Sequence, residues 1–358
     1  AAGRRTGRNI SLRRVRHNCH VIVTREEGGD SSMGSSTFRL STAFRHGRTK
    51  IDDIYFEAPF KLMTPFTNGR HSDFVVMLAS PGFLKGDEAH IEIAFGPGTD
   101  STIKTQSYEK VFDTEDGSAS RTIELDVRGD AKAVFLPFPV IPFRNSSFTN
   151  LTTAHITAES TFVYADVVTC GRVGMDERWA MRRFTNRMRV YVAEPQPVTE
   201  AAAAESARQH AHRRGRPSKA ESAAAQPQER MAFADRMLLE PDAFDYTELG
   251  MWRDFTHCGV LYAHLPEADP AAGQADTDAD ENGAGASAAA IRERIETARI
   301  AAEDTLIDRI RSHADAIGFT GELGVSRVID GICLRVLTSR GDDAFDLIKD
   351  VAGFVTEG

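Results

Sequence analysis

The stretch Thr122-Ile123-Glu124-Leu125-Asp126-Val127 alternates between polar and aliphatic side chains with a period of two. The earlier stretch Ile91-Glu92-Ile93-Ala94-Phe95 alternates in the same way. Successive side chains of a β-strand point to opposite faces of the sheet, so this pattern is typical of half-buried strands. Both stretches are predicted to be strands that turn one face toward a core.

Turn signals separate these strands at even intervals. They are Pro81-Gly82, Gly96-Pro97-Gly98, Asp116-Gly117 and Arg128-Gly129-Asp130. Evenly spaced strands without an intervening helical pattern indicate a β-sandwich, a barrel or a layered β-solenoid. The predicted fold class is therefore mainly β, with helices confined to the C-terminal part.

The helical pattern begins late in the chain. Apolar residues recur every three or four positions along one stretch, which is typical of an amphipathic helix: Ile291, Ile295, Ala298, Ala302, Leu306, Ile310, Ala314 and Ile317. A second, shorter pattern of this kind is formed by Leu347, Ile348, Val351 and Val355. The segment 331–338 between the two is a strand candidate.

Composition divides the chain into six segments. Residues 199–230 carry almost no large apolar side chain, so burial there cannot offset the entropy of ordering the chain. The predicted organisation is a basic, Gly/Ser-rich extension (1–36), a β-rich core (37–198), a low-complexity linker insert (199–230), a return segment to the core (231–265), an acidic insert (266–289) and a C-terminal α/β segment that completes the core (290–358).

Charge and hydropathy exclude several classes of protein. The chain of 358 residues has 43 Lys and Arg against 52 Asp and Glu, a formal net charge of −9, which disfavours nucleic acid as a general partner. No apolar stretch approaches the roughly 18 residues that a membrane helix needs. Four dispersed cysteines and the lack of an apolar stretch after the N-terminal arginines indicate a cytoplasmic protein.

Common catalytic motifs are absent from the sequence. It contains no P-loop, no GxSxG nucleophile elbow, no HExxH and no GxGxxG after a strand, so an enzyme is not expected. One segment suggests an alternative function. Arg214-Gly215-Arg216-Pro217 resembles the core of an AT-hook, in which arginine enters the narrow A·T minor groove, so a DNA-associating protein is the alternative hypothesis.

Several ionisable residues stand inside or beside apolar strand sequence. Asp166 interrupts the run 162–168, Asp87 follows a tight turn, and Arg172 and Glu177 lie in the loop that leaves the strand of Asp166. A charge removed from water costs several kcal/mol unless it is paired or binds a metal. One interpretation is that Arg172 pairs with a carboxylate and locks a turn. The other is a conduit or weak divalent site lined by carboxylate oxygens.

A third hypothesis uses two of the same carboxylates for catalysis. Asp87 and Glu177 could act as the acid/base pair of a β-fold hydrolase. That chemistry needs a nucleophile or a carboxyl group with a raised pKa in a pocket, and the sequence offers no nucleophile motif.

Four ordered motifs resemble the UreD/UreH family of urease accessory proteins, most closely its UreH-type branch. The segment 79–87 is similar to the family's glycine-rich Gly-Asp turn, 104–111 to its Thr-Gln strand, and 136–143 to its Pro-Phe-Pro segment. Gly171-Arg172 followed by Glu177 matches a further motif. The resemblance is close over 36–192 and continues more faintly over 251–261 and 320–355, and its motif residues are Gly82, Gly86, Thr105, Gln106 and Gly171.

The resemblance implies a β-helix-like fold and a non-catalytic role. Family members are scaffolds that bind UreF and UreG and dock on the urease apoprotein, which receives nickel. For this chain we expect nickel in transit without a tightly bound cofactor, and a dimer within the accessory complex. Asp87, Asp166 and Glu177 are the residues expected to line the nickel conduit, with Arg172 balancing their charge.

Overall fold

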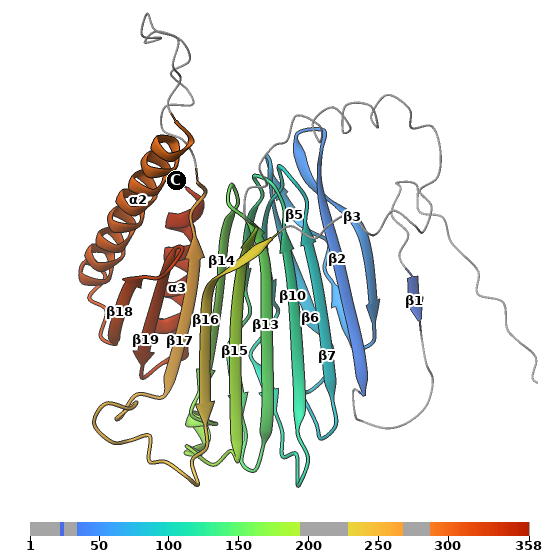
Figure 1. The fold of residues 1–358 in the computed structure, drawn as a ribbon. Coiled ribbons are helices and arrows are strands. Elements are labelled where there is room, and N and C mark those ends of the chain that lie inside the picture. The colour runs from blue at the N-terminus through green and yellow to red at the C-terminus, as the bar shows by residue number, and fades with distance from the viewer. Residues whose placement is uncertain (1–21, 25–33, 194–227, 268–286, 358) are drawn as a thin grey trace, which may run out of the picture.

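The computed structural model describes residues 22–24, 34–193, 228–267 and 287–357, which form two large β-sheets and two helices (Figure 1). Sheet A contains, in spatial order, β1 (Ile22–Thr24), β3 (Arg48–Glu57), β2 (Ser35–Arg45), β7 (Glu88–Phe95), β10 (Ala119–Val127), β13 (Ser147–Thr157), β15 (Arg183–Ala193) and β16 (Glu229–Leu239).

Sheet B lies opposite sheet A and carries the C-terminal strands. Its order is β18 (Glu322–Arg327), β19 (Ile332–Thr338), β17 (His257–His264), β14 (Thr161–Thr169), β11 (Lys132–Leu136), β8 (Asp100–Thr105), β6 (His71–Leu78) and β4 (Phe60–Leu62). Three short strands pair alongside this path: β5 (Phe66–Asn68), β9 (Glu109–Val111) and β12 (Val140–Pro142).

The chain winds between the two sheets as a β-solenoid. It passes from β6 in sheet B to β7 in sheet A, and repeats this step from β8 to β10, from β11 to β13 and from β14 to β15. Neighbouring strands of successive coils are parallel. The prediction of a mainly β, layered stack of strands is confirmed.

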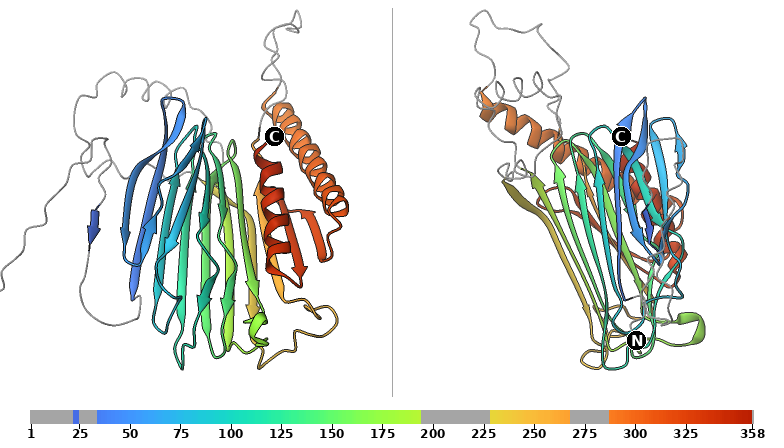
Figure 2. Two further views of the ribbon diagram at one scale, coloured as in Figure 1. Left: turned by 180° about the vertical axis from the view of Figure 1, so that it is seen from behind. Right: turned by 90° about the vertical axis from the view of Figure 1, so that its right-hand side faces the viewer.

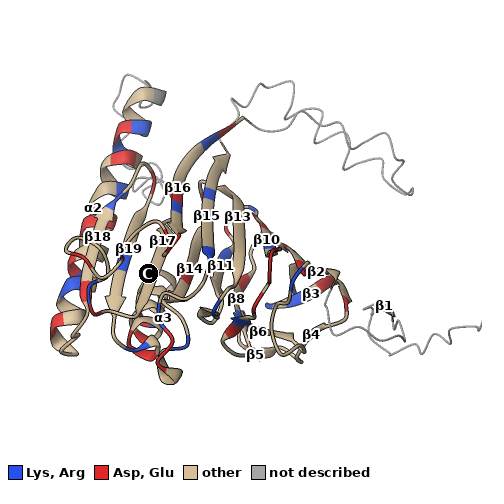
Figure 3. Cartoon of the chain, turned by 90° about the horizontal axis from the view of Figure 1, so that it is seen from below, with Lys and Arg blue, Asp and Glu red and all other residues tan. Residues whose placement is uncertain are grey.

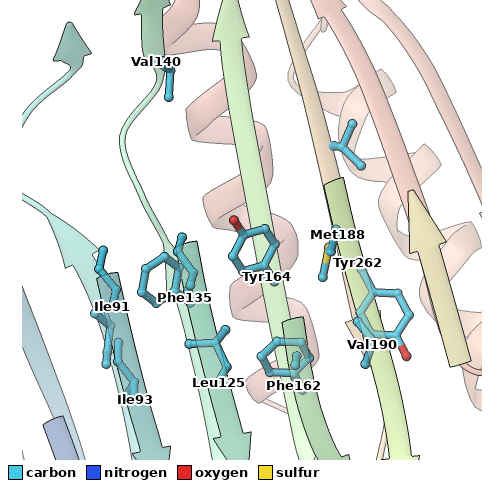
Figure 4. Close-up of a cluster of buried hydrophobic side chains, with 14 of the residues drawn as sticks. Ile91, Ile93, Leu125, Phe135, Val140, Phe162, Tyr164, Met188, Val190 and Tyr262 are labelled. Carbon is cyan, nitrogen blue, oxygen red and sulfur yellow. The ribbon is translucent and has the colours of Figure 1, made fainter. Parts of the chain in front are cut away.

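Register explains why the period-two stretches form this core. Ile91 pairs with Ile123 and Ile93 with Leu125, so the aliphatic positions of successive coils stack inside the solenoid. All four side chains are buried, and burying an aliphatic side chain of this size contributes about 1.5–3 kcal/mol. Figure 4 shows this interior, where residues of both sheets interdigitate.

The two helices cover the other face of sheet B (Figure 2). α2 (Ala288–Ala316) and α3 (Gly341–Thr356) bury Leu306, Ile310, Leu347 and Val351 against the outward aliphatic side chains of that sheet. The prediction of C-terminal helices is confirmed, and β19 covers most of the strand candidate. The sequence pattern did not identify β18, which has no clear alternation of buried and exposed residues.

Several sequence features lie outside the described residues. They include the AT-hook-like segment 214–217 and most of the predicted inserts 199–230 and 266–289. Within the described ranges, no helix is long and apolar enough to cross a membrane.

Candidate functional site

The loops that lead from sheet B to sheet A stack on one another at one end of the solenoid. They comprise residues 79–87, 112–118, 143–146 and 170–182. Backbone hydrogen bonds join them: Phe112 N donates to Phe83 O at 2.9 Å, and Asn145 N donates to Ala180 O at 2.8 Å. Residues that are distant in sequence thus share one end of the molecule, which we call the loop end.

Two motif glycines are required by this stacking. Gly82 has a φ of 153°, and a Cβ atom there would lie 2.4 Å from the carbonyl oxygen of Lys110. Gly171 has a φ of 139°, and its Cβ would lie 2.5 Å from the carbonyl oxygen of Glu177. Only glycine tolerates both the dihedral angle and the close approach of a neighbouring backbone. Gly86 also has a positive φ, of 83°, but open space around it.

Asp87 is completely buried and organises the first loop. Its carboxylate accepts hydrogen bonds from the backbone N–H groups of Leu84 at 2.7 Å and Gly34 at 3.1 Å. These two backbone donors tie the side chain to the turn at 84 and to the residue that precedes β2. The geometry gives Asp87 a positioning role at the start of β7.

Glu177 and Arg172 form an ion pair in the last loop. Arg172 Nε donates to Glu177 Oε1 at 3.0 Å and Nη2 donates to Oε2 at 2.5 Å, a bidentate arrangement. Arg144 N donates to Glu177 Oε1 at 2.8 Å. The Arg172 hydrogen bond holds the pKa of Glu177 below its ordinary value. The interpretation that Arg172 pairs with a carboxylate and locks a turn is confirmed for this pair.

Asp166 points from β14 into the space between the two sheets. Its Oδ2 accepts hydrogen bonds from Tyr164 Oη at 2.6 Å, Asn150 Nδ2 at 3.2 Å and Asn186 Nδ2 at 3.2 Å. Its Oδ1 lies 3.5 Å from Arg121 Nη2. An ionisable group and its polar partners therefore lie among the aliphatic and aromatic side chains between the two sheets.

Arg121 is the cation at the centre of this network and is 1% exposed. It stands in register with Asn150 and Asn186 on the neighbouring strands of sheet A, and its Nε donates to Asn150 Oδ1 at 2.8 Å. Its Nη1 forms an ion pair with Glu109, which enters from β9 on the opposite side. Arg121 thus connects Glu109 to Asp166 through the core.

Burial has a clear electrostatic cost in this network. Desolvation raises the pKa values of Glu109 and Asp166, and the positive charge of Arg121 opposes both shifts. Desolvation raises the pKa of Tyr164 well above its ordinary value, so its hydroxyl remains a neutral donor. An ion pair in the interior is weak evidence for stability, because dehydrating its members costs several kcal/mol per ion. Stability alone therefore does not explain why these charged residues are buried, which suggests that they have a function.

One side of the network opens into a pocket of about 370 Å³ at the loop end. Glu109 lines this pocket together with the motif residues Gly82, Thr105 and Gln106. Thr105 Oγ1 also accepts a hydrogen bond from Phe138 N at 2.8 Å, which fixes the segment 136–143 beside it. We call this cavity the Glu109 pocket.

A second pocket, of about 400 Å³, adjoins the Glu109 pocket. Tyr108 and Lys110 line both cavities, and Gly171, Arg172 and His257 line the second one alone. Burial lowers the pKa of His257 to about 4, so its imidazole is neutral near neutral pH. The family motifs quoted from the sequence therefore surround two neighbouring cavities at the loop end.

The other side of the network approaches the gap between the last strand of sheet A and the end of sheet B. Asp235 on β16 is 6% exposed and forms an ion pair with Arg335 on β19. After the larger effects of burial and of Arg121, the charge of Asp235 contributes to the raised pKa of Asp166. Arg335 also lines a cavity of about 440 Å³. We define the polar track as Glu109, Arg121, Asn150, Asn186, Asp166, Asp235 and Arg335.

The structure distributes the predicted site residues over three environments. Asp87 lies in the first loop, Glu177 pairs with Arg172 in the last loop, and Asp166 alone belongs to the polar track. Their role in nickel passage stays a prediction. The lowered pKa of Glu177 disfavours the hydrolase hypothesis, since a general acid at neutral pH requires a raised one.

Sequence reasoning missed Arg121 and Glu109. A signal for Arg121 was present, because it is in phase with Ile123, Leu125 and Val127 and so belongs to the buried face of its strand. Glu109 gave no comparable signal, because its strand is three residues long. Among the described residues, no three His, Cys, Asp or Glu side chains converge in a way that could hold a metal ion.

These features place the protein in the class of parallel β-solenoids, with charged residues in the interior and glycine-dependent loops at one end. The family model described as UreD urease accessory protein matches residues 34–357. The chain belongs to this family.

Curated relatives agree with this membership. The chain is 36% identical over 157 residues to the urease accessory protein UreH of Helicobacter pylori, an alignment that covers 43% of this chain and 59% of that protein. It is 32% identical over 148 residues to UreD of Acetivibrio thermocellus, covering 40% and 56%. It is 30% identical over 169 residues to UreD of Haemophilus influenzae, covering 45% and 62%. The chain thus spans about three fifths of the length of the curated relatives it matches.

Proposed function

We propose that the chain is a non-catalytic scaffold for urease maturation in the cytoplasm. In this proposal it binds UreF and UreG, docks on the urease apoprotein and passes nickel toward the urease active site. The family membership supports the role in urease maturation. The single observation that supports metal passage is the polar track, in which Arg121 joins Glu109 at its pocket to Asp166, and in which the charge of Asp235, paired with Arg335, acts on Asp166.

The chemistry of the polar track suits transient contact with a divalent cation. Glu109, Asp166 and Asp235 supply carboxylate oxygens, whereas Arg121 and Arg335 offset most of their charge. Nickel binds most tightly where nitrogen and sulfur ligands converge, and dispersed oxygen ligands hold it weakly. A path that releases its cargo requires this weak, distributed binding.

The residues of the loop end have a supporting role in this proposal. Asp87 and the Arg172–Glu177 pair hold the first and last loops; the first loop lines the Glu109 pocket and the last loop lines the second pocket beside it. Their substitution is expected to change the shape of the pocket, so Asp87 and Glu177 affect nickel passage through position. Asp166 is the residue for which we propose direct contact with nickel in transit.

The proposal is tested by urease maturation in cells whose urease genes, UreF and UreG come from the same source as this chain. We expect nickel-loaded, active urease with the wild-type chain and a loss of about tenfold or more with Asp166→Asn, which removes one charge from the track. Asp308→Asn, on the exposed surface of α2, is the matched control.

Co-purification with UreF and UreG separates the two parts of the proposal. A variant that binds both proteins but leaves urease without nickel supports the track. Normal urease activity with Asp166→Asn contradicts it and leaves the scaffold role intact. A folded wild-type chain that captures neither UreF nor UreG contradicts the scaffold role itself.

A further inference from the structure

Sheet B extends past sheet A at its C-terminal edge. Sheet A ends with β16, whereas sheet B continues beyond β17 to β19 and β18 (Figure 1). α2 and α3 pack on the face of these two strands that bears Leu323, Val325 and Leu334. β16 approaches the opposite face through the ion pair of Asp235 with Arg335. Beyond this contact the opposite face opens into a cavity.

The cavity has a volume of about 440 Å³ and lies between a strand pair and a loop. β18 and β19 contribute Gly324, Arg335 and Leu337, and the loop between β16 and β17 contributes Met251 and Trp252. Trp252 is 7% exposed and forms part of an apolar floor. A cavity of this size with apolar walls and a charged rim can receive a bulky side chain of another molecule.

Gly324 leaves part of the cavity wall without a side chain, although no described neighbour requires a glycine there. It lies in the middle of β18, its φ is not positive, and a Cβ atom would have no neighbour within 4 Å. Gly331, in the turn after β18, differs: its φ is 103°, and a Cβ there would collide with the carbonyl oxygen of Ala263. A glycine inside a strand weakens it and often marks the close approach of a ligand or another backbone. The open space at Gly324 therefore points to an external molecule.

The loop that borders the cavity is long and exposes large apolar side chains. It comprises residues 240–256, which we call the acidic loop, and ordered loops of this length without regular structure are usually functional. Leu249 is 89% exposed, more than any other large apolar side chain among the described residues, and Phe244 and Met251 are 57% and 44% exposed. Large apolar side chains exposed together are typical of an interaction site.

Aromatic packing holds the acidic loop in place. Trp179 stacks on Tyr246 with ring centroids 4.8 Å apart and meets Trp252 edge-on at the same distance. Trp252 N donates to Tyr246 O at 2.9 Å, which closes the loop on itself. The exposed side chains are thus presented by a fixed scaffold, which reduces the entropy lost when a partner binds.

The charge of the acidic loop is strongly one-sided. Its sequence contains five acidic residues and one basic residue, Arg253, which is paired with Glu322 of β18. Asp242, Glu248 and Asp254 are exposed and form no ion pair with any described residue. α2 differs, because basic and acidic residues alternate along it (Figure 3). The surface beside the cavity therefore carries a negative charge that the described parts of the chain leave uncompensated.

We propose that the cavity and the acidic loop together dock a partner protein that inserts a large apolar side chain flanked by lysine or arginine. The occupant is chosen by complementarity, because the cavity accepts an apolar side chain and the unpaired carboxylates of the loop attract cations. The proposal rests on the scaffold role proposed above, and it assigns a surface to one of the maturation partners. Since Arg335 lines the cavity and belongs to the polar track, the docked partner lies beside that end of the track.

The two parts of this docking site contribute differently to binding. An apolar anchor in a well-packed pocket supplies much of the affinity of an interface. Exposed charges at the rim mainly accelerate association, and their effect falls as ionic strength rises. Substitutions in the cavity should therefore raise the dissociation rate, and substitutions of the loop carboxylates should lower the association rate.

Biolayer interferometry with the purified full-length chain tests the proposal against UreF, UreG and urease apoprotein from the same source, presented singly and as a mixture. We expect one of these proteins to bind the wild type and to lose about tenfold or more in affinity with Leu249→Asp. Ile329→Asp is the matched control and should bind like the wild type, because Ile329 is 69% exposed in the turn at the other end of the β18–β19 hairpin.

Gly324→Phe tests the cavity independently by filling it from within the chain. The new side chain has open space and phenylalanine is favoured in strands, so the variant should be as stable as the wild type in thermal unfolding. Its affinity for the same partner should fall by about tenfold or more. Glu248→Lys should slow association a few-fold at low salt, and Asp308→Lys on α2, where Asp308 is 78% exposed, is its control.

Three results would overturn the proposal. Binding that is unchanged in Leu249→Asp or in folded Gly324→Phe contradicts the docking site and leaves the scaffold role intact. A wild-type chain that binds none of the three proteins contradicts the scaffold role, and the docking site falls with it. Self-association of the chain alone that Leu249→Asp abolishes assigns the surface to a second copy instead of a partner protein.

Discussion

Sheet B separates two interiors of different chemistry. On the side of the helices, Val163, Ala165 and Val167 of β14 pack in a layer of aliphatic side chains. On the side of sheet A, Tyr164 and Asp166 of the same strand join a network of buried charges. One strand thus serves an ordinary hydrophobic core with one face and a polar interior with the other. Stability alone explains the first face, whereas the cost of burying charge on the second indicates selection for a function.

Among substitutions that distinguish the polar interior from the aliphatic one, Arg121→Met is expected to change stability most. It leaves Glu109 and Asp166 buried without their cation, which should lower the free energy of unfolding by about 3–5 kcal/mol. Leu347→Ala in the helix layer is the comparison, and its lost packing should cost about 2–5 kcal/mol. Urea denaturation measures both.

The two variants differ in how pH should modify the damage. The loss in Arg121→Met should shrink as pH falls, because the two orphaned carboxyl groups can then take up protons, whereas the loss in Leu347→Ala should not change with pH. An equal and pH-independent loss in both variants would contradict the assignment of a charged role to Arg121.

A smaller effect is expected at His257, where the solenoid meets the start of α3. Burial lowers the pKa of His257 to about 4, so the unfolded chain takes up a proton below about pH 6.5 before the folded chain does. Stability should therefore fall as pH decreases from about 6.5 to 4, by on the order of 2–3 kcal/mol from this residue.

The variant His257→Gln isolates this contribution. A second histidine, His71, has the opposite pH dependence. The hydrogen bond to Asp100 raises the pKa of His71, so its stabilising contribution is present below about pH 6.5 and is lost as pH rises through the pKa of the folded state. The difference between the unfolding free energies of wild type and His257→Gln removes the effect of His71. A difference that does not change between pH 6.5 and 4 would show that His257 is hydrated in the folded state.

The smallest effect concerns the loop end, where charge is paired near solvent. Glu177→Gln should cost about 1 kcal/mol at neutral pH, because Arg172 is 37% exposed and water screens the pair. Hydrogen bonding to Arg172 lowers the pKa of Glu177, so its contribution is present above the unfolded value and is lost as pH falls through the folded one. Denaturation of both proteins over a pH series from 7 into the acid range should show the difference shrink as the Glu177 carboxylate takes up a proton; a loss that stays constant would exclude an electrostatic origin.

Much of the fold could be predicted because its core repeats a simple pattern. The alternation at 91–95 and 122–127 identifies strands, and the parallel register that stacks them follows from burying one face of each. β17 could not be recognised by alternation, because all eight of its residues are buried. Each face of β17 contacts one of the two interiors, so no exposed polar residues alternate with buried ones along this strand.

The candidate site was predictable only where charge interrupts apolar sequence. Asp166 was found in this way, and the phase of Arg121 relative to Ile123 offered the same signal. The contact of Arg121 with Glu109 depends on β9 and β10 lying in opposite layers, which local sequence does not encode. Asp235 and Arg335 are even further apart in the sequence, and only the arrangement of the strands brings them together.

Transfer of nickel between purified components tests most directly whether the polar interior passes nickel. Nickel-loaded UreG, UreF, the full-length chain and urease apoprotein are mixed, and the nickel bound to re-isolated urease is measured over time. We predict that Asp166→Asn keeps the complex together but slows transfer by about tenfold, whereas Asp308→Asn transfers at the wild-type rate. Equal rates for all three proteins, with the complex intact, would contradict nickel passage through Asp166 and leave the buried charges with a structural role alone.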